Sequence, residues 1–345
     1  MQQKSFDYCI VGQGLAGTLL AYFLKKSGKN VLIFDQNLEG SASMVAAGIV
    51  NPVTGKNFVK TWRAEEFLDS ALEIYNDIAC DLGINIYTKA NIVRAILTSK
   101  EENLWLSRSS DSQFDQFIID PFDASEFEGK VCKPFTYGES KGSFHVHLKA
   151  ILLEFRKKWL ADSSLINEAF NHQELRFLES SFSYHDLSFT ELIYCEGHKA
   201  IYNPFFTNTG LDPAKGEVLL VKIPNANFRK MYKDKIFIVH QYDDIYWVGS
   251  GYEWNATDDR PTQAMYAYLT DELMRILTVP YEVVEHQAAI RPTMRDRRPI
   301  FLRHQEYHNM YLFNGLGTKG SSIAPFAARQ FARYLIDKDE ADLMI

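Results

Sequence analysis

Residues 6–17 of the chain read FDYCIVGQGLAG, a short apolar run that leads into three glycines. If this run is a strand followed by a helix, Gly12 permits the tight turn between them and Gly14 lets backbone approach a pyrophosphate. Gly17 then lets helix and strand pack closely. The start of the helix offers free N–H groups and a positive dipole end to the phosphates. The residues expected around the phosphates are Gly12, Gly14, Leu15, Ala16 and Gly17.

A second apolar run, NVLIF at residues 30–34, completes a strand, helix and strand unit and leads into an acid. Asp35 stands where a carboxylate can accept hydrogen bonds from the ribose hydroxyls of a dinucleotide. Gln36 beside it is expected to share this site. The sequence therefore predicts a Rossmann-type dinucleotide site, although the motif alone does not separate FAD from NAD.

Two further segments favour FAD. Residues 40–49, GSASMVAAGI, are rich in small side chains and hydroxyls, as suits a chain lying flat against a cofactor; a flexible surface loop is the alternative. Residues 315–320, GLGTKG, open the last predicted helix and offer its N-terminus and a cation to the electron-rich edge of a reduced flavin; an ordinary capped helix is the alternative. The FAD contacts predicted here are Ser43, Met44, Ala46, Ala47, Gly48, Ile49, Gly315, Gly317, Thr318, Lys319 and Gly320.

Apolar residues recur at helical spacing over 60–82, in a helix expected to lead out of the nucleotide unit. Later elements are expected to return to this unit, with helices over 147–160 and 321–336. Strands are expected at 164–170 and 191–195. Ala169, within the first of these strands, and Gly197, just after the second, are further predicted cofactor contacts.

The rest of the chain predicts a second lobe. Strand-like runs at 92–97 and 131–137 lack the alternation of strand and helix seen at the N-terminus. Alternating strands with one helix at 262–277 then predict an antiparallel sheet covered on one side. The predicted boundaries are 1–75, 146–205 and 291–345 for the FAD-binding lobe, and 76–145 and 206–290 for the substrate lobe.

Composition narrows the class of protein. The 345 residues carry a formal net charge of −7, which disfavours a general electrostatic grip on nucleic acid. No 18 apolar residues run together, so no membrane-spanning helix is expected. The four cysteines contain no C-x-x-C pair, which fits free thiols in a reducing compartment and predicts a cytoplasmic location.

Taken together, these segments resemble the FAD-dependent D-amino-acid oxidase superfamily, which includes glycine oxidase, sarcosine oxidase and the flavin domain of the bifunctional enzyme that modifies tRNA wobble uridines. The likeness covers nearly the whole chain. It also includes the sequence IRPT at 290–293, followed by Asp296 and Pro299. The resemblance implies an α/β protein: a glutathione-reductase-type FAD-binding Rossmann domain, and an α+β substrate domain on a mixed, mainly antiparallel sheet.

The resemblance also gives roles to two cations, proposed as catalytic residues. Arg291 of the IRPT element would hold a substrate carboxylate, which a planar guanidinium can bind with two hydrogen bonds; a surface arginine paired with acids is the alternative. Lys319 would stabilise reduced flavin, contact the carboxylate or assist electron transfer to oxygen; the alternative is an exposed lysine. Because no cysteine lies near the arginine segment, FAD is expected to be non-covalent.

The substrate pocket is less well specified. Residues 48–56, GIVNPVTGK, match no characterised branch of the superfamily, although they should approach the flavin. The residues predicted to line the pocket are Asn51, His240, Tyr246, Tyr252 and Arg291. His145 and His147 have no third ligand at metal spacing, so no metal site is predicted.

The predicted activity is oxidation of a C–N bond in a small amine or amino acid, such as a D-amino acid, glycine or an N-substituted glycine. The substrate would transfer a hydride to flavin N5, the resulting imine would be hydrolysed, and oxygen or another acceptor would take the electrons. One alternative is a stand-alone enzyme that acts on a carboxymethylaminomethyl group of tRNA. Others are a flavin-binding protein without turnover and an NAD-dependent dehydrogenase. The sequence does not predict an oligomeric state.

Overall fold

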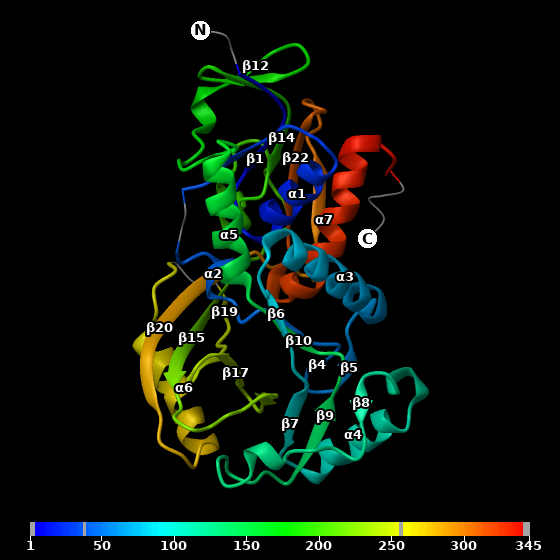
Figure 1. The fold of residues 1–345 in the computed structure, drawn as a ribbon, viewed down its shortest axis with the longest axis vertical. Coiled ribbons are helices and arrows are strands. Elements are labelled where there is room, and N and C mark those ends of the chain that lie inside the picture. Colours follow the sequence, from blue (N-terminus) through cyan, green and yellow to red (C-terminus); the bar gives the residue numbers. More distant parts are fainter. Residues whose placement is uncertain (1–3, 37–38, 255–257, 341–345) are drawn as a thin grey trace.

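The computed structural model describes residues 4–36, 39–254 and 258–340 (Figure 1). The outer ends of the predicted FAD-binding lobe, residues 1–3 and 341–345, lie outside the described residues. Along the longest axis of the molecule, one sheet with its helices occupies one end and a second sheet occupies the other (Figure 1). One crossing between the two ends lies where α2 (Ala42–Val45) meets β20 (Glu282–Arg291) of the second sheet (Figure 1).

The first sheet has eight strands, in the order β11-β2-β1-β14-β13-β12, with β22 on β14 and β21 on β22. β1 pairs in parallel with β2 and with β14. Helices cover both faces of a parallel sheet, so its strands are buried on both sides and are formed by continuous apolar runs such as that of β2. The bounds of its strands are Lys4–Val11 for β1, Val31–Phe34 for β2, Leu165–Ile166 for β11, Leu175–Phe177 for β12, Phe182–Tyr184 for β13, Leu187–Tyr194 for β14, Ile300–Arg303 for β21 and Met310–Asn314 for β22.

Four helices share one buried core with this sheet. They are α1 (Leu15–Lys26), α3 (Ala64–Leu82), α5 (Leu148–Ala161) and α7 (Gly320–Asp337). The helix predicted from the apolar spacing over 60–82 forms as α3. It ends at Gly83, which adopts the left-handed conformation with φ 68°. Ile78, Ala79 and Leu82 of α3, beyond residue 75, also pack in this core.

The second sheet has nine strands, in the order β19-β15-β18-β17-β16-β7-β9-β8, with β20 on the outer edge of β15. Its pairs are antiparallel except for β16 with β7, so the sheet is mixed and mainly antiparallel. Together with the first sheet it confirms the predicted fold class. Its strands are β7 (Ile92–Ile96), β8 (Ile118–Ile119), β9 (Thr136–Ser140), β15 (Ala214–Lys222), β16 (Met231–Lys233), β17 (Phe237–Tyr242), β18 (Ile245–Gly249), β19 (Glu253–Trp254) and β20 (Glu282–Arg291).

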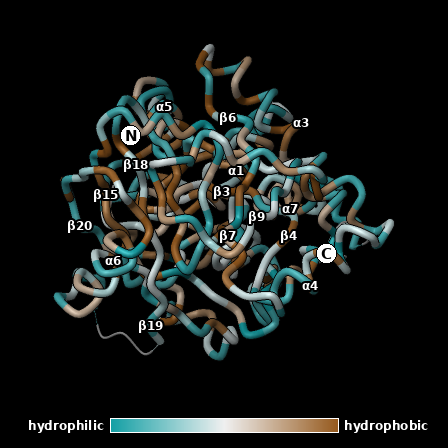
Figure 2. The backbone as a smooth tube through the Cα atoms, turned by 90° about the horizontal axis from the view of Figure 1, so that it is seen from below, coloured by the Kyte–Doolittle hydropathy of each residue, from teal (hydrophilic) through white to brown (hydrophobic). Residues whose placement is uncertain are grey.

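Helix α6 (Gln263–Ile276) covers one face of the second sheet through a buried core of its own. Between the two ends lie the sheet of β3 (Ile49–Val50), β10 (Phe144–Val146) and β6 (Tyr87–Lys89) and the hairpin of β4 (Val53–Thr54) and β5 (Val59–Lys60). The remaining elements are helix α4 (Ser99–Ser109), beside the second sheet, and the 3-10 turns Ser112–Phe114, Ser125–Phe127, His172–Glu174, Gly197–Tyr202 and Gly317–Lys319. Figure 2 shows apolar residues concentrated in the central strands and hydrophilic residues on the outer loops.

Two predicted strands are wrong in extent. Over 131–137, only an isolated bridge at Val131 and the start of β9 at Thr136 form, because Pro134 between them has no N–H to donate to a ladder. Over 164–170, the strand stops at Ile166, and the side chain of Asn167 instead accepts a hydrogen bond from Arg156.

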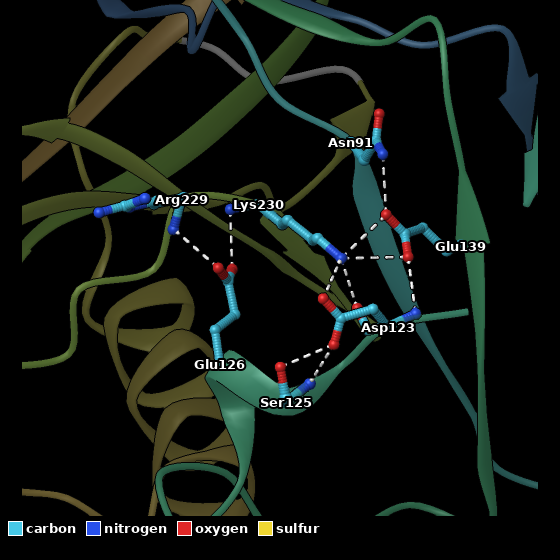
Figure 3. Close-up of polar contacts among 7 residues, drawn as sticks. All are labelled: Asn91, Asp123, Ser125, Glu126, Glu139, Arg229 and Lys230. Atoms are coloured by element: carbon cyan, nitrogen blue, oxygen red, sulfur yellow. Dashed lines mark hydrogen bonds and ion pairs between the residues drawn. The ribbon is translucent and has the colours of Figure 1, made fainter. Parts of the chain in front are cut away.

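A polar cluster fastens neighbouring strands of the second sheet to one another (Figure 3). Nζ of Lys230 forms ion pairs with the buried Glu139 at 3.0 Å and with Asp123 at 3.3 Å. Asn91 donates to Glu139 at 2.8 Å, and Glu126 accepts the backbone N–H of Lys230 at 2.8 Å. These bonds tie the ends of β7, β9 and β16 to the 3-10 turn Ser125–Phe127. No helix in the described part of the chain is long and apolar enough to cross a membrane.

Candidate active site

A cavity of about 620 Å³ is lined by residues of both sheets and of the segments between them. The glycine loop after β1 and the N-terminus of α1 form one part of its wall, and β15, β18 and β20 of the second sheet form another. The predicted site residues that line it are Gly12, Gly14, Leu15, Ala16, Asp35, Ser43, Met44, Ala46, Ala47, Gly48, Ile49, Asn51, Gly197, Arg291, Gly317, Thr318, Lys319 and Gly320. The structure thus brings together segments from the whole length of the chain.

The glycine loop is shaped by close backbone contacts. A Cβ on Gly12, whose φ is 104°, would lie 2.4 Å from the carbonyl oxygen of Cys195, and one on Gly17 would lie 1.9 Å from that of Gly12. Gly17 therefore acts by packing α1 against the loop and does not itself line the cavity. Gly14 is the N-cap of α1, and a Cβ added to it would meet only Ser43 Oγ, at 3.4 Å. The same hydroxyl accepts a hydrogen bond from the backbone N–H of Leu15 at 3.1 Å. The positive end of the α1 dipole therefore faces the cavity beside Ser43.

The acid at the end of β2 is held by a buried arginine that the sequence patterns do not single out. Oδ1 of Asp35 accepts a hydrogen bond from Arg156 at 2.7 Å, and Oδ2 accepts one from the backbone N–H of Gln13 at 2.9 Å. Arg156 also donates to the side chains of Gln13 and Asn167. Its place on the buried face of α5, among apolar residues, is the signal that could have identified it. These contacts fix the Asp35 carboxylate at the cavity wall.

The segment over 40–49 connects the two sheets. A Cβ on Gly48, whose φ is 72°, would lie 1.9 Å from the carbonyl oxygen of Val146, so only glycine fits beside β10. The carbonyl of Val45 accepts a hydrogen bond from the indole of Trp247 on β18 at 2.9 Å. Trp247 lines the cavity from the second sheet, although the sequence did not predict it as a site residue. This stretch is therefore a wall of the cavity.

Arg291 ends β20 opposite Ala214 of β15, and its guanidinium reaches the cavity. Nη2 donates a hydrogen bond to Ser250 Oγ at 2.8 Å, and the guanidinium carbon lies 5.4 Å from the ring centre of Tyr252. Nη1 is buried and has no hydrogen-bond partner in the described structure. Burial lowers the pKa of Arg291 below its usual range, and no carboxylate of the described residues forms an ion pair with it. A buried cation with an unused donor is expected to bind an anion.

Lys319 lines the cavity beside the same segment. The backbone N–H of Gly317 donates to the carbonyl of Pro292 at 3.0 Å, which joins the turn before α7 to the residue that follows Arg291. Nζ of Lys319 lies 3.3 Å from Thr61 Oγ1 and 3.5 Å from Thr54 Oγ1. Burial and, second, the charge of Arg297 lower the pKa of Lys319 below its usual range.

Other predicted residues do not reach the cavity. Tyr246 is buried in the core under α6, where its hydroxyl accepts the N–H of Phe228 at 3.2 Å. His240 is exposed and bonds the carbonyl of Asp243 at 2.8 Å. Tyr252 lies beside the cavity only through its contact with Arg291. Gln36 and Ala169 are exposed outside the cavity, and Gly315 forms a turn with φ 79°.

The glycine-loop end of the cavity fits a dinucleotide. It combines the N-terminus of α1, a glycine whose missing side chain leaves the backbone accessible, and a carboxylate held at the end of β2. The cavity volume is also in the range of cofactor sites.

Comparison with known proteins agrees with this geometry. A family model described as FAD dependent oxidoreductase matches residues 7–334. The crystal structure of glycine oxidase from Geobacillus kaustophilus superposes with a TM-score of 0.81 at 18% identity, covering 97% of this chain and 96% of that one. Iminodiacetate oxidase from Chelativorans sp. BNC1 has a TM-score of 0.79 at 18% identity, covering 96% and 95%. L-proline dehydrogenase from P. horikoshii has a TM-score of 0.76 at 13% identity, covering 98% and 95%. These structures share the fold of this chain.

Proposed function

Since the chain belongs to the family of FAD-dependent oxidoreductases, we propose that it oxidises a C–N bond in a small amine or amino acid that carries a carboxylate. When bound, FAD supplies the redox chemistry, accepting a hydride from the carbon next to nitrogen and passing electrons to oxygen or another acceptor. Hydrolysis of the imine then gives a carbonyl compound and an amine. The cytoplasmic location and the identity of the acceptor stay predictions.

One observation carries the proposal: Nη1 of Arg291 is buried, points to no acceptor and belongs to a guanidinium without an ion-pair partner in the described part of the chain. A planar guanidinium matches a carboxylate with two parallel hydrogen bonds and stays charged at every working pH. Arg291 therefore holds the substrate carboxylate and fixes the direction of the adjacent C–H bond. Positioning of this kind supplies a large part of the rate enhancement, so the mechanism requires no strong protein base.

Other residues of the cavity hold the cofactor. Backbone at Gly12 and Gly14 and the N-terminus of α1 would hold the pyrophosphate, and Asp35 would accept hydrogen bonds from the ribose. Lys319 would place a positive charge where negative charge develops during reduction. Cys195 lines the cavity near the glycine loop, but burial raises the pKa of its thiol and disfavours the thiolate, in keeping with non-covalent FAD.

The test is anaerobic mixing of the FAD-loaded protein with a panel of amines and amino acids, including glycine, sarcosine, D-amino acids and N-substituted glycines. We expect at least one carboxylate-bearing amine to bleach the visible flavin band and to give the carbonyl product in equal amount. A panel in which no amine bleaches the flavin, while dithionite does, would contradict the reaction class.

A further inference from the structure

Three cationic side chains, Arg291, Arg297 and Lys319, line the cavity away from the glycine loop, at what we call its substrate end. Three carboxylates also line the cavity, each beside residues other than these cations. Asp35 pairs with Arg156, Glu196 lies beside Gly12, accepts a hydrogen bond from Asn203 and lies 3.4 Å from His172 Nε2, and Asp259 lies beside Gly40. In the described residues, no carboxylate forms an ion pair with any of the three cations. The substrate end therefore carries positive charge that the chain itself does not neutralise.

Lys319 is held by neutral partners only. Its ammonium lies at long hydrogen-bonding distance from the hydroxyls of Thr54 and Thr61, which belong to the hairpin of β4 and β5 and to the residue after it. The hydroxyl of Thr61 donates to the carbonyl of Asn51, and Arg94 donates to the carbonyl of Gly55 at 2.8 Å. The hairpin is thus fixed over the substrate end, with two hydroxyls beside the ammonium.

Arg297 is distinct from its neighbours in the same basic run. Arg295 is exposed and pairs with Asp212 at 3.4 Å, and the guanidinium of Arg298 lies 4.9 Å from the ring centre of Trp62. Arg297 is also exposed, but it lines the cavity, with a backbone φ of 62°, and its charge contributes to the lowered pKa of Lys319. The half-buried ammonium of Lys319 and the exposed guanidinium of Arg297 therefore line one cavity, where an anion between them would be stabilised by both charges.

A charge count then limits the substrate. With the pyrophosphate of FAD at the glycine loop and no charge on the oxidised isoalloxazine, one substrate carboxylate on Arg291 leaves Lys319 and Arg297 without a counter-ion. We propose that the substrate is an amino- or iminodicarboxylic acid whose second carboxylate binds Lys319 and Arg297, with the hydroxyl of Thr54 as a further donor. This inference rests on the proposed function, since it requires the first carboxylate to lie on Arg291.

The test compares two thioethers that cannot be oxidised as amines, thiodiacetate and methylthioacetate, which differ by the second carboxylate. Each is titrated into the FAD-loaded protein, and the Kd is taken from the change in the flavin absorption spectrum. We expect thiodiacetate to bind about tenfold more tightly or better, the gain of one charge-assisted hydrogen bond. In Arg297→Gln and in Lys319→Met, this preference should fall to about threefold or less.

Arg295→Gln is the matched control, because Arg295 belongs to the same basic run but lies outside the cavity lining. It should keep the full preference for thiodiacetate. Equal affinity of wild-type protein for the two thioethers would overturn the second carboxylate site and leave the proposed function standing. If the Arg295 variant also loses the preference for thiodiacetate, general surface charge explains the preference, and the second carboxylate site is overturned. If neither thioether binds and Arg291→Met changes nothing, the proposed function itself fails.

Discussion

The guanidinium of Arg291 lies directly over Gly216, so that a Cβ on Gly216 would come within 1.9 Å of Nη2. We predict that Gly216→Ala displaces the guanidinium and weakens methylthioacetate binding about tenfold. The free energy of unfolding should change by less than about 1 kcal/mol, because the displaced group is the end of a flexible side chain. Spectral titration and urea unfolding measure the two effects. An unchanged Kd would show that Gly216 does not position Arg291.

Arg291 should lower the stability of the ligand-free protein and raise its affinity for a carboxylate ligand. Replacing a buried, incompletely bonded charge by an apolar side chain of similar length is often neutral or stabilising. Arg291→Met should therefore leave the free energy of unfolding unchanged or raise it by about 1–2 kcal/mol. The same variant should weaken binding of a carboxylate ligand by about tenfold to a hundredfold. Strong destabilisation of the variant would mean that Arg291 has a structural partner.

Arg156 should support both FAD binding and stability. Arg156→Met removes the guanidinium that holds Asp35, whose side chain is only 21% exposed. We expect the free energy of unfolding to fall by about 1–3 kcal/mol and the Kd for FAD to rise. Fluorescence quenching of added FAD measures the affinity. Arg176→Met, at an exposed position on β12, is the control and should change neither quantity.

Acid stability should depend on His145, which lies buried on β10. Burial, followed by the charges of His147 and His240, lowers the pKa of His145 from 6.5 to about 3. Between those values the unfolded chain binds more protons at this position, so its contribution makes the protein less stable as pH falls from 6.5. His145→Gln should remove a slope of up to about 1.4 kcal/mol per pH unit. Urea unfolding at several pH values, with the exposed His308→Gln as control, tests this; equal slopes in all three proteins contradict it.

Local patterns predicted the nucleotide end of the cavity, because each feature there depends on residues close in sequence. Gly12, Gly14 and Asp35 belong to one strand, turn and strand. The cavity-lining residues of the second sheet were harder to predict from the sequence. Side chains alternate between the two faces of a strand, so a shift of one position moves a residue from the cavity to the core. Tyr246 faces the core under α6, whereas the adjacent Trp247 faces the cavity.

Two further contributors come from contacts across the chain. Arg156 meets Asp35 only once α5 lies against the first sheet, and Thr54 and Thr61 reach Lys319 only through the hairpin after β3. Neither arrangement follows from spacing in the sequence. The position of His240 also could not be predicted, because a register shift on β17 begins at this residue.

The central claim is that Arg291 orients a substrate through its carboxylate for oxidation at the adjacent C–N bond. The most direct measurement is the anaerobic rate of flavin bleaching by the best amino acid of the panel and by the amine that lacks its carboxylate. We predict that wild-type protein reacts at least about a hundredfold faster with the amino acid, and that Arg291→Met removes most of this difference. Equal rates with the two compounds in wild-type protein would contradict the account.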